Sequence, residues 1–84
     1  MSSEELTDET IEKLQELAED PNIPKNIKTK IKNIIGILQE DKELPIKTNK
    51  ALNELDEISN DPNLEAYTRT QLWGVVSVLE KINH

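Results

Sequence analysis

The sequence predicts an all-α domain of four helices, arranged as two tandem αα-hairpins. Apolar residues recur at spacings of three and four in four separate segments, as they do in helices with one buried stripe. Clusters of Asp, Asn and Pro separate these segments and are typical of turns. No segment alternates between apolar and polar residues for long enough to indicate a strand. Because the chain has only 84 residues, we expect a single domain over residues 1–84.

The first helix is expected to end near Glu19, because Pro21 disfavours helical geometry in the residue before it. At its start, Ser2 with Glu5 fits a capping box, and Thr7 is an alternative cap. Its apolar stripe is predicted to consist of Ile11, Leu14, Leu17 and Ala18.

The second helix is predicted to follow directly, with Asn22 as its N-cap and Pro24 tolerated in its first turn. It should run to about Gln39. Its apolar positions are Ile27, Ile31, Ile34, Ile35 and Leu38. Residues 40–44 then form the predicted linker between the two hairpins.

The third helix is expected to begin near Pro45, whose missing N–H costs nothing at a helix start. Asp61 and Pro62 should stop it, and Asn63 is the predicted cap of the fourth helix. The inward residues of the third helix are Thr48, Ala51, Leu52, Leu55 and Ile58. The fourth segment is predicted to bury one stripe, made of Leu64, Thr68, Leu72, Val75, Leu79 and Ile82.

The two hairpins resemble each other at a constant offset of 41 residues. Residues 11–39 and 52–80 share seven identities in 29 aligned pairs, and an Asp-Pro-Asn triplet in both anchors the register. We interpret the chain as one helical hairpin used twice, with units at about residues 7–40 and 45–82. The alternative is that there was no duplication, and that the two hairpins look alike because turns are limited in type. A HEAT-like pair and a compact antiparallel bundle both fit this pattern.

Composition argues against several kinds of chemistry. The chain has no Cys, so it forms no disulfide, thiolate nucleophile or Cys-ligated metal site. Its one imidazole belongs to His84, the last residue, where no Ser-His-Asp arrangement is expected. Asp61, Asn63 and Glu65 begin like a calcium loop, but the positions that follow do not fit. We therefore expect no enzyme activity, no catalytic residue, no cofactor and no metal site.

The sequence also predicts a cytoplasmic protein. Its first residues are acidic and lack the apolar stretch of a signal peptide. No apolar run approaches the roughly 18 residues that a membrane-spanning helix needs.

The net charge of −7 is unevenly distributed along the chain. Residues 1–22 carry −7, residues 23–50 carry +4 and residues 51–84 carry −4. Lys25, Lys28 and Lys32 share one flank of the second helix and form a candidate basic patch for phosphates or an acidic partner. The alternative is a solvated face that offsets the acidic first helix, because no aromatic residue interleaves with these lysines to stack bases.

The outward side of the fourth helix is the second unusual surface. It is small and nearly uncharged, and its candidate interface residues are Ala66, Tyr67, Thr70, Trp73, Gly74 and Ser77. A helix that is apolar or neutral almost all round is normally buried. Three interpretations follow: a central helix of the monomer, a homodimer interface, or a docking face for another protein.

Two segments carry a resemblance to a known family. Leu55–Asn63, followed by a Thr-Arg-Thr helix containing Trp73, resembles a family of small archaeal proteins that is uncharacterised, and so does Glu19–Lys28. The resemblance covers nearly the whole chain beyond the first few residues. It implies an all-helical cytosolic protein, and it supplies no catalytic residue.

The leading hypothesis from the sequence is a non-enzymatic helical module for protein–protein interaction or self-association, acting as a homodimer or through a protein partner at the fourth helix. The alternative is a nucleic-acid-associated factor that uses the lysines of the second helix. Net negative charge weighs against wholesale binding to nucleic acid.

Overall fold

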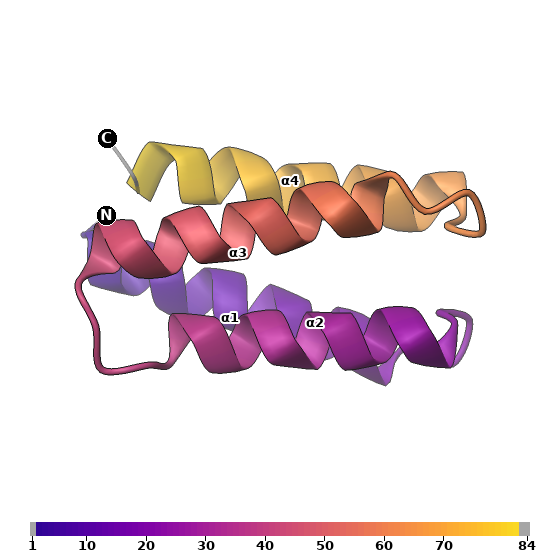
Figure 1. Cartoon of the computed structure of the whole chain (residues 1–84), viewed down its shortest axis with the longest axis horizontal. Coiled ribbons are helices and arrows are strands. Elements are labelled where there is room, and N and C mark those ends of the chain that lie inside the picture. The colour runs from indigo at the N-terminus through magenta and orange to yellow at the C-terminus, as the bar shows by residue number, and fades with distance from the viewer. Residues whose placement is uncertain (1, 83–84) are drawn as a thin grey trace.

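The computed structural model describes residues 2–82 as four helices joined by short turns (Figure 1). These helices are α1 (Ser3–Glu19), α2 (Lys25–Leu38), α3 (Leu44–Ser59) and α4 (Ala66–Ile82). Each runs antiparallel to the one before it, so α1 begins at the end of the molecule where α4 finishes (Figure 1). The predicted all-α class with four helices is confirmed.

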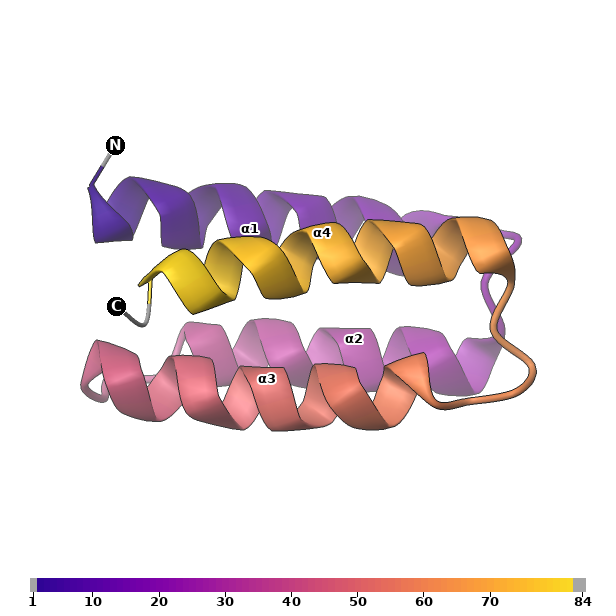
Figure 2. The same cartoon turned by 90° about the horizontal axis from the view of Figure 1, so that it is seen from above.

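The helices form a closed antiparallel bundle. Each contacts its neighbours in the chain, and α1 also contacts α4. Figure 2 shows this pairing, with α4 beside α1 and α3 beside α2. A HEAT-like pair would instead place α1 beside α3, and within residues 2–82 no Cα atom of α1 lies within 8 Å of a Cα atom of α3. The bundle is therefore the alternative that the chain adopts.

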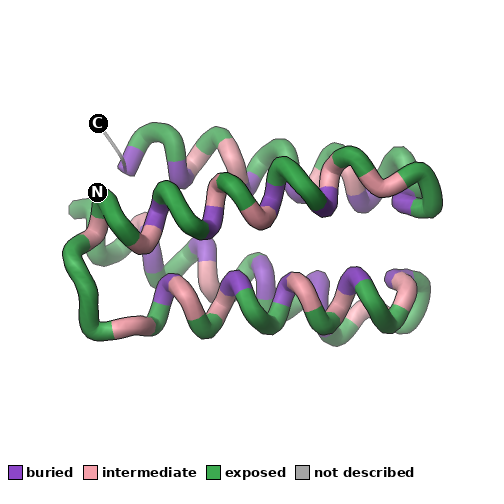
Figure 3. Tube along the Cα trace, in the orientation of Figure 1, coloured by how far each residue is buried: buried purple, intermediate pink, exposed green. Residues whose placement is uncertain are grey.

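One buried stripe per helix fills the centre of this bundle (Figure 3). The predicted stripe of α4, together with Leu64 before it, is buried at every position. Ile11, Ile35 and Leu52 are only half-buried and pack against the edge of the core. The largest fully enclosed side chains are aliphatic or Thr: Leu14, Ile27, Ile31, Ile34, Leu38, Thr48, Leu55, Ile58, Leu72 and Leu79.

The start of α1 confirms Ser2 as its cap. The Ser2 hydroxyl oxygen accepts a hydrogen bond from the Glu5 N–H at 3.2 Å, and the hydroxyl donates to Glu5 Oε1 at 3.2 Å. Thr7 lies inside the helix, where its buried hydroxyl donates to the Ser3 carbonyl at 2.8 Å. Thr7 is therefore not the cap. The helix ends at Glu19, as predicted.

The predicted caps Asn22 and Asn63 are wrong, because α2 begins at Lys25 and α4 begins at Ala66. The residue before Pro24 cannot readily be helical, so α2 can start no earlier than that proline. The N-cap position is occupied by Pro24, which forms no side-chain capping bond.

A hydrogen-bonded turn occupies both of these positions instead. The Asp20 carboxylate accepts the Asn22 N–H at 2.9 Å, and Asp61 accepts the Asn63 N–H at the same distance. In each turn the next residue is apolar and buried, and its N–H donates to the carbonyl of that Asp at 3.2 Å. The triplet therefore builds a turn that sends an apolar side chain into the core, and the helix starts after it.

The core makes a prediction about the two hairpins. Leu14 and Leu55 lie 41 residues apart, and neither exposes any surface. Replacing either with Ala leaves a cavity of the same size, so each change should lower the free energy of unfolding by about 3 kcal/mol. Chemical denaturation of both variants measures this. A loss below about 1 kcal/mol at one site and not the other would contradict the equivalence of the two positions.

Candidate interaction surface

The outward side of α4 is exposed along its length. We call Ala66, Tyr67, Thr70, Trp73, Gly74 and Ser77 the α4 face, and all six are exposed. Trp73 exposes 57% and Tyr67 66% of its surface. The interpretation of α4 as the central helix of the monomer is therefore wrong. Each helix of a four-membered ring buries only the stripe that points at the axis, so the neutral opposite side of α4 stays outside.

Two grooves border the α4 face. The groove between α4 and α1 has a volume of about 430 Å³ and includes Gly74, Val75 and Val78 in its lining. On the opposite side, a groove of about 300 Å³ separates α4 from α3, and Trp73 and Val76 line it. The sequence could not reveal these grooves, because each is formed by helices that are brought together only in the folded bundle.

The small residues of the face are not required by the fold. A Cβ atom added at Gly74 would meet no atom within 4 Å, and the same holds for Gly36 on α2. The Thr70 hydroxyl donates to the Ala66 carbonyl at 3.0 Å, so its hydrogen-bonding need is met inside the helix. The face is therefore neutral and largely satisfied, which lowers the cost of removing water from it.

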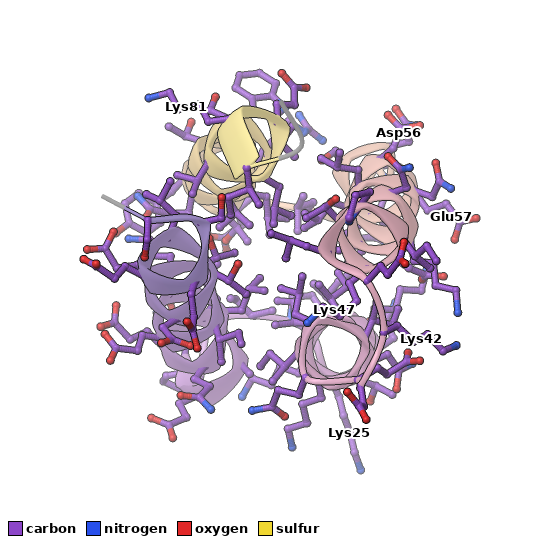
Figure 4. The ribbon with its side chains drawn as sticks, turned by 90° about the vertical axis from the view of Figure 1, so that its left-hand side faces the viewer. Lys25, Lys42, Lys47, Asp56, Glu57 and Lys81 are labelled. Carbon is purple, nitrogen blue, oxygen red and sulfur yellow. The ribbon has the colours of Figure 1, made fainter. Side chains whose placement is uncertain are left out.

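The three lysines of the basic patch lie on α2, at spacings of three and four residues that put them on one side of the helix. Lys25 and Lys32 are exposed and Lys28 is half-buried, and Figure 4 shows Lys25 extending away from the bundle. Among residues 2–82, the only ion pair within 4 Å joins Lys42 to Glu40, so the patch is unneutralised by close contacts. The outer side of the adjacent α1 carries mainly carboxylates (Figure 4).

The Lys42–Glu40 pair lies in the turn between α2 and α3. Lys42 Nζ is 3.0 Å from Glu40 Oε2, and this hydrogen bond lowers the pKa of Glu40 and raises the pKa of Lys42. A carboxyl whose folded pKa is lowered stabilises the fold at higher pH, and this contribution disappears as the pH falls through the lowered pKa. Because the pair is exposed, its effect on stability is small.

The remaining candidate sites from the sequence concern metal binding and the chain's single imidazole. No three His, Cys, Asp or Glu residues within it lie close enough to hold a metal ion. The Asp61 carboxylate serves the turn described above, and the Asp61 carbonyl accepts a long hydrogen bond from Arg69 Nη2 at 3.4 Å. His84 lies outside the described residues. No helix among residues 2–82 is long and apolar enough to cross a membrane.

Comparison with known proteins identifies the family. Residues 1–82 match the Uncharacterised protein family (UPF0147). The chain belongs to this family. A crystal structure of the unknown function protein MMP1188 shares 39% identity with it, with a TM-score of 0.88 over 94% of this chain and 91% of that one. No curated protein matches.

The resemblance of the Asp-Pro-Asn and Trp73 segments to an uncharacterised family is thus confirmed as far as the family is concerned. Its relative MMP1188 has the same fold, and the description of that protein carries no activity.

The two exposed glycines yield a stability prediction. Gly36→Ala and Gly74→Ala should each raise the free energy of unfolding by about 0.5–1 kcal/mol, because Ala is the better helix former and its methyl group meets nothing. Thermal unfolding at dilute protein concentration measures both. A loss of stability in either variant would contradict this prediction, because it would mean that the added methyl group meets a neighbouring atom.

Proposed function

We propose that this protein is a non-enzymatic helical module that binds protein through the α4 face, in self-association or with another chain. The observation that supports this most directly is the exposed Trp73, which lines the groove between α4 and α3. Large aromatic residues are enriched at interfaces and account for much of their binding energy. Burying the exposed part of an indole gives on the order of 2 kcal/mol at about 25 cal/mol per Å².

The α4 face is not needed to complete the core, and this supports a role for it in binding. The core is closed without Trp73 or Tyr67, and both rings stand in water in the monomer. An exposed apolar patch beside grooves is a mark of binding sites in soluble proteins. A cytoplasmic location and lack of enzyme activity belong to the same proposal.

Replacing Trp73 with Asp tests the proposal. Because the indole is outside the core, the variant should stay folded, whereas burying a carboxylate at an interface should weaken association at least tenfold. Light scattering measures self-association, and crosslinking in native extract detects other partners. Ile46→Asp is the matched control, because Ile46 on α3 is also an exposed large hydrophobic residue, at 46%.

Two results would contradict the proposal. One is a wild-type protein that stays monomeric and crosslinks to no reproducible partner. The other is association that Trp73→Asp and Ile46→Asp weaken equally, because the effect would then not depend on the α4 face.

A second candidate function is association with nucleic acid through the basic patch. It is favoured by the three lysines that gather on one helix without a close carboxylate. Phosphate contacts by lysine make binding steeply salt-dependent. In a gel-shift series, changing Lys25, Lys28 and Lys32 to Glu should abolish a complex that forms at low salt. Binding that is insensitive to these changes, or to salt, would exclude the patch.

A further inference from the structure

We propose that the groove between α3 and α4 binds a cationic side chain, Lys or Arg, of a protein partner. This inference rests on the proposed function and names the chemistry that the partner must present. The groove has a volume of about 300 Å³, and the residues that line it are Leu52, Asp56, Ser59, Trp73, Val76 and Glu80. It combines apolar surface, an aromatic ring and two carboxylates in one place.

This lining matches the two parts of a long basic side chain. Leu52 and Val76 are half-buried and pack against the core, so they offer apolar surface to an aliphatic stem. Trp73 exposes 57% of its surface, and the face of an indole attracts a Lys or Arg cation that lies within about 6 Å of the ring. Asp56 and Glu80 are exposed on the two helices that flank the groove, and each supplies a charged acceptor for the end of the side chain.

The two carboxylates are not neutralised by a close cation of this chain. Asp56 and Glu80 form no ion pair within 4 Å in the part of the chain that the structure describes. Lys81 follows Glu80 in the sequence, but Figure 4 shows it on the side of α4 away from α3. Arg69 serves the turn before α4, where its Nη2 donates to the Asp61 carbonyl at 3.4 Å. The groove thus keeps two acceptors that a partner's cation can use.

Other occupants fit the groove less well. An apolar side chain would cover both carboxylates without replacing the water around them, which costs free energy. An anionic group would be repelled by the same carboxylates and by the net charge of −7. A cationic side chain covers the apolar part with its stem and replaces the lost water with charged hydrogen bonds. The chemistry of the lining therefore favours Lys or Arg.

The positions 41 residues earlier show that the fold does not require this chemistry. Leu52 and Val76 have apolar counterparts that are also half-buried, Ile11 and Ile35. The two acids and the Trp have exposed counterparts of a different kind: Gln15, Lys32 and Gln39. The first hairpin thus keeps the residues that pack against the core and has neither an acid nor an aromatic ring at the other three positions. The set that suits a cation belongs to the second hairpin alone.

Titration with short peptides of stated charge tests the inference. The probe is a blocked Lys-Gly-Lys-Gly-Lys peptide, and the same peptide with Gln in place of each Lys is its neutral control. Trp73, the only tryptophan, reports occupancy of the groove through its fluorescence. We expect a saturable change in emission with the Lys peptide and none with the neutral one. The dissociation constant should rise with salt, because salt screens exposed charges.

A variant that combines Asp56→Gln with Glu80→Gln should bind the Lys peptide about tenfold more weakly, because both charged acceptors are lost. It should fold normally, since the counterpart of each acid in the first hairpin is Gln. The matched control combines Glu12→Gln with Glu16→Gln. It removes the same two charges from exposed positions of α1 that lie outside the groove, and should change the dissociation constant by no more than about twofold, because distant charges are screened.

Three results would overturn the inference: no saturable binding of the Lys peptide, a control variant that weakens binding as much as the groove variant does, or binding of spermidine as tight as that of the peptide. The last result would assign the groove to a free polyamine. The proposed function fails separately. If Trp73→Asp weakens association in light scattering or crosslinking and the groove variant does not, the interaction module stands and cation recognition is excluded. If there is neither peptide binding nor association, both fail.

Discussion

The structure depends on the closure of four buried stripes around one axis. Each helix contributes aliphatic side chains at three- and four-residue spacing, and no aromatic residue is needed to fill the space between them. Because the ring is complete with four helices, no helix in it is central, and every helix keeps an outer side in contact with water. This constraint explains why the single Trp is outside the core. Trp73 has no place inside a ring that Leu72 and Val75 already close.

The turns that join the helices are fixed by the same core. In each hairpin, the residue after Asp-Pro-Asn is apolar and almost fully buried, at Ile23 and at Leu64. The Asp carboxylate holds the chain in the bend that directs this side chain inward. The chain reverses direction in both hairpins through the same backbone hydrogen bond, at positions 41 residues apart. The turn therefore contributes to the core as well as connecting two helices.

Local patterns predicted most of this structure, and they failed where the outcome depended on distant residues. The stripes, the end of α1 and the Ser2 cap follow from nearby sequence, and they were predictable. The first residues of α2 and α4 were not predictable. An Asn before a helix normally indicates an N-cap, but here the burial of the residue after Asn22 and after Asn63 requires a turn. The sequence also left the choice between a bundle and a HEAT-like pair undecided. That choice depends on contact between α1 and α4, which lie at opposite ends of the chain. The exposure of α4 follows from that closure, so its neutral composition alone was misleading.

The most informative comparison lies between the outer sides of α2 and α4. All six positions of the α4 face have counterparts 41 residues earlier, and these are exposed as well: Lys25, Asn26, Thr29, Lys32, Asn33 and Gly36. The fold therefore leaves both sets of positions exposed to solvent and requires no particular side chain at them. Exposure to water is favourable for the charged Lys32 side chain. It is unfavourable for the apolar ring of Trp73 at the equivalent position.

This difference separates what the two surfaces can bind. Ammonium groups are strongly hydrated, so a partner that covers the lysines must replace that water with anions, as phosphate or carboxylate would. None of the six residues of the α4 face is charged, so this face gives up its water at lower cost than the lysines do. The shared fold accounts for neither composition, and the binding proposed for each surface would give the difference a physical reason.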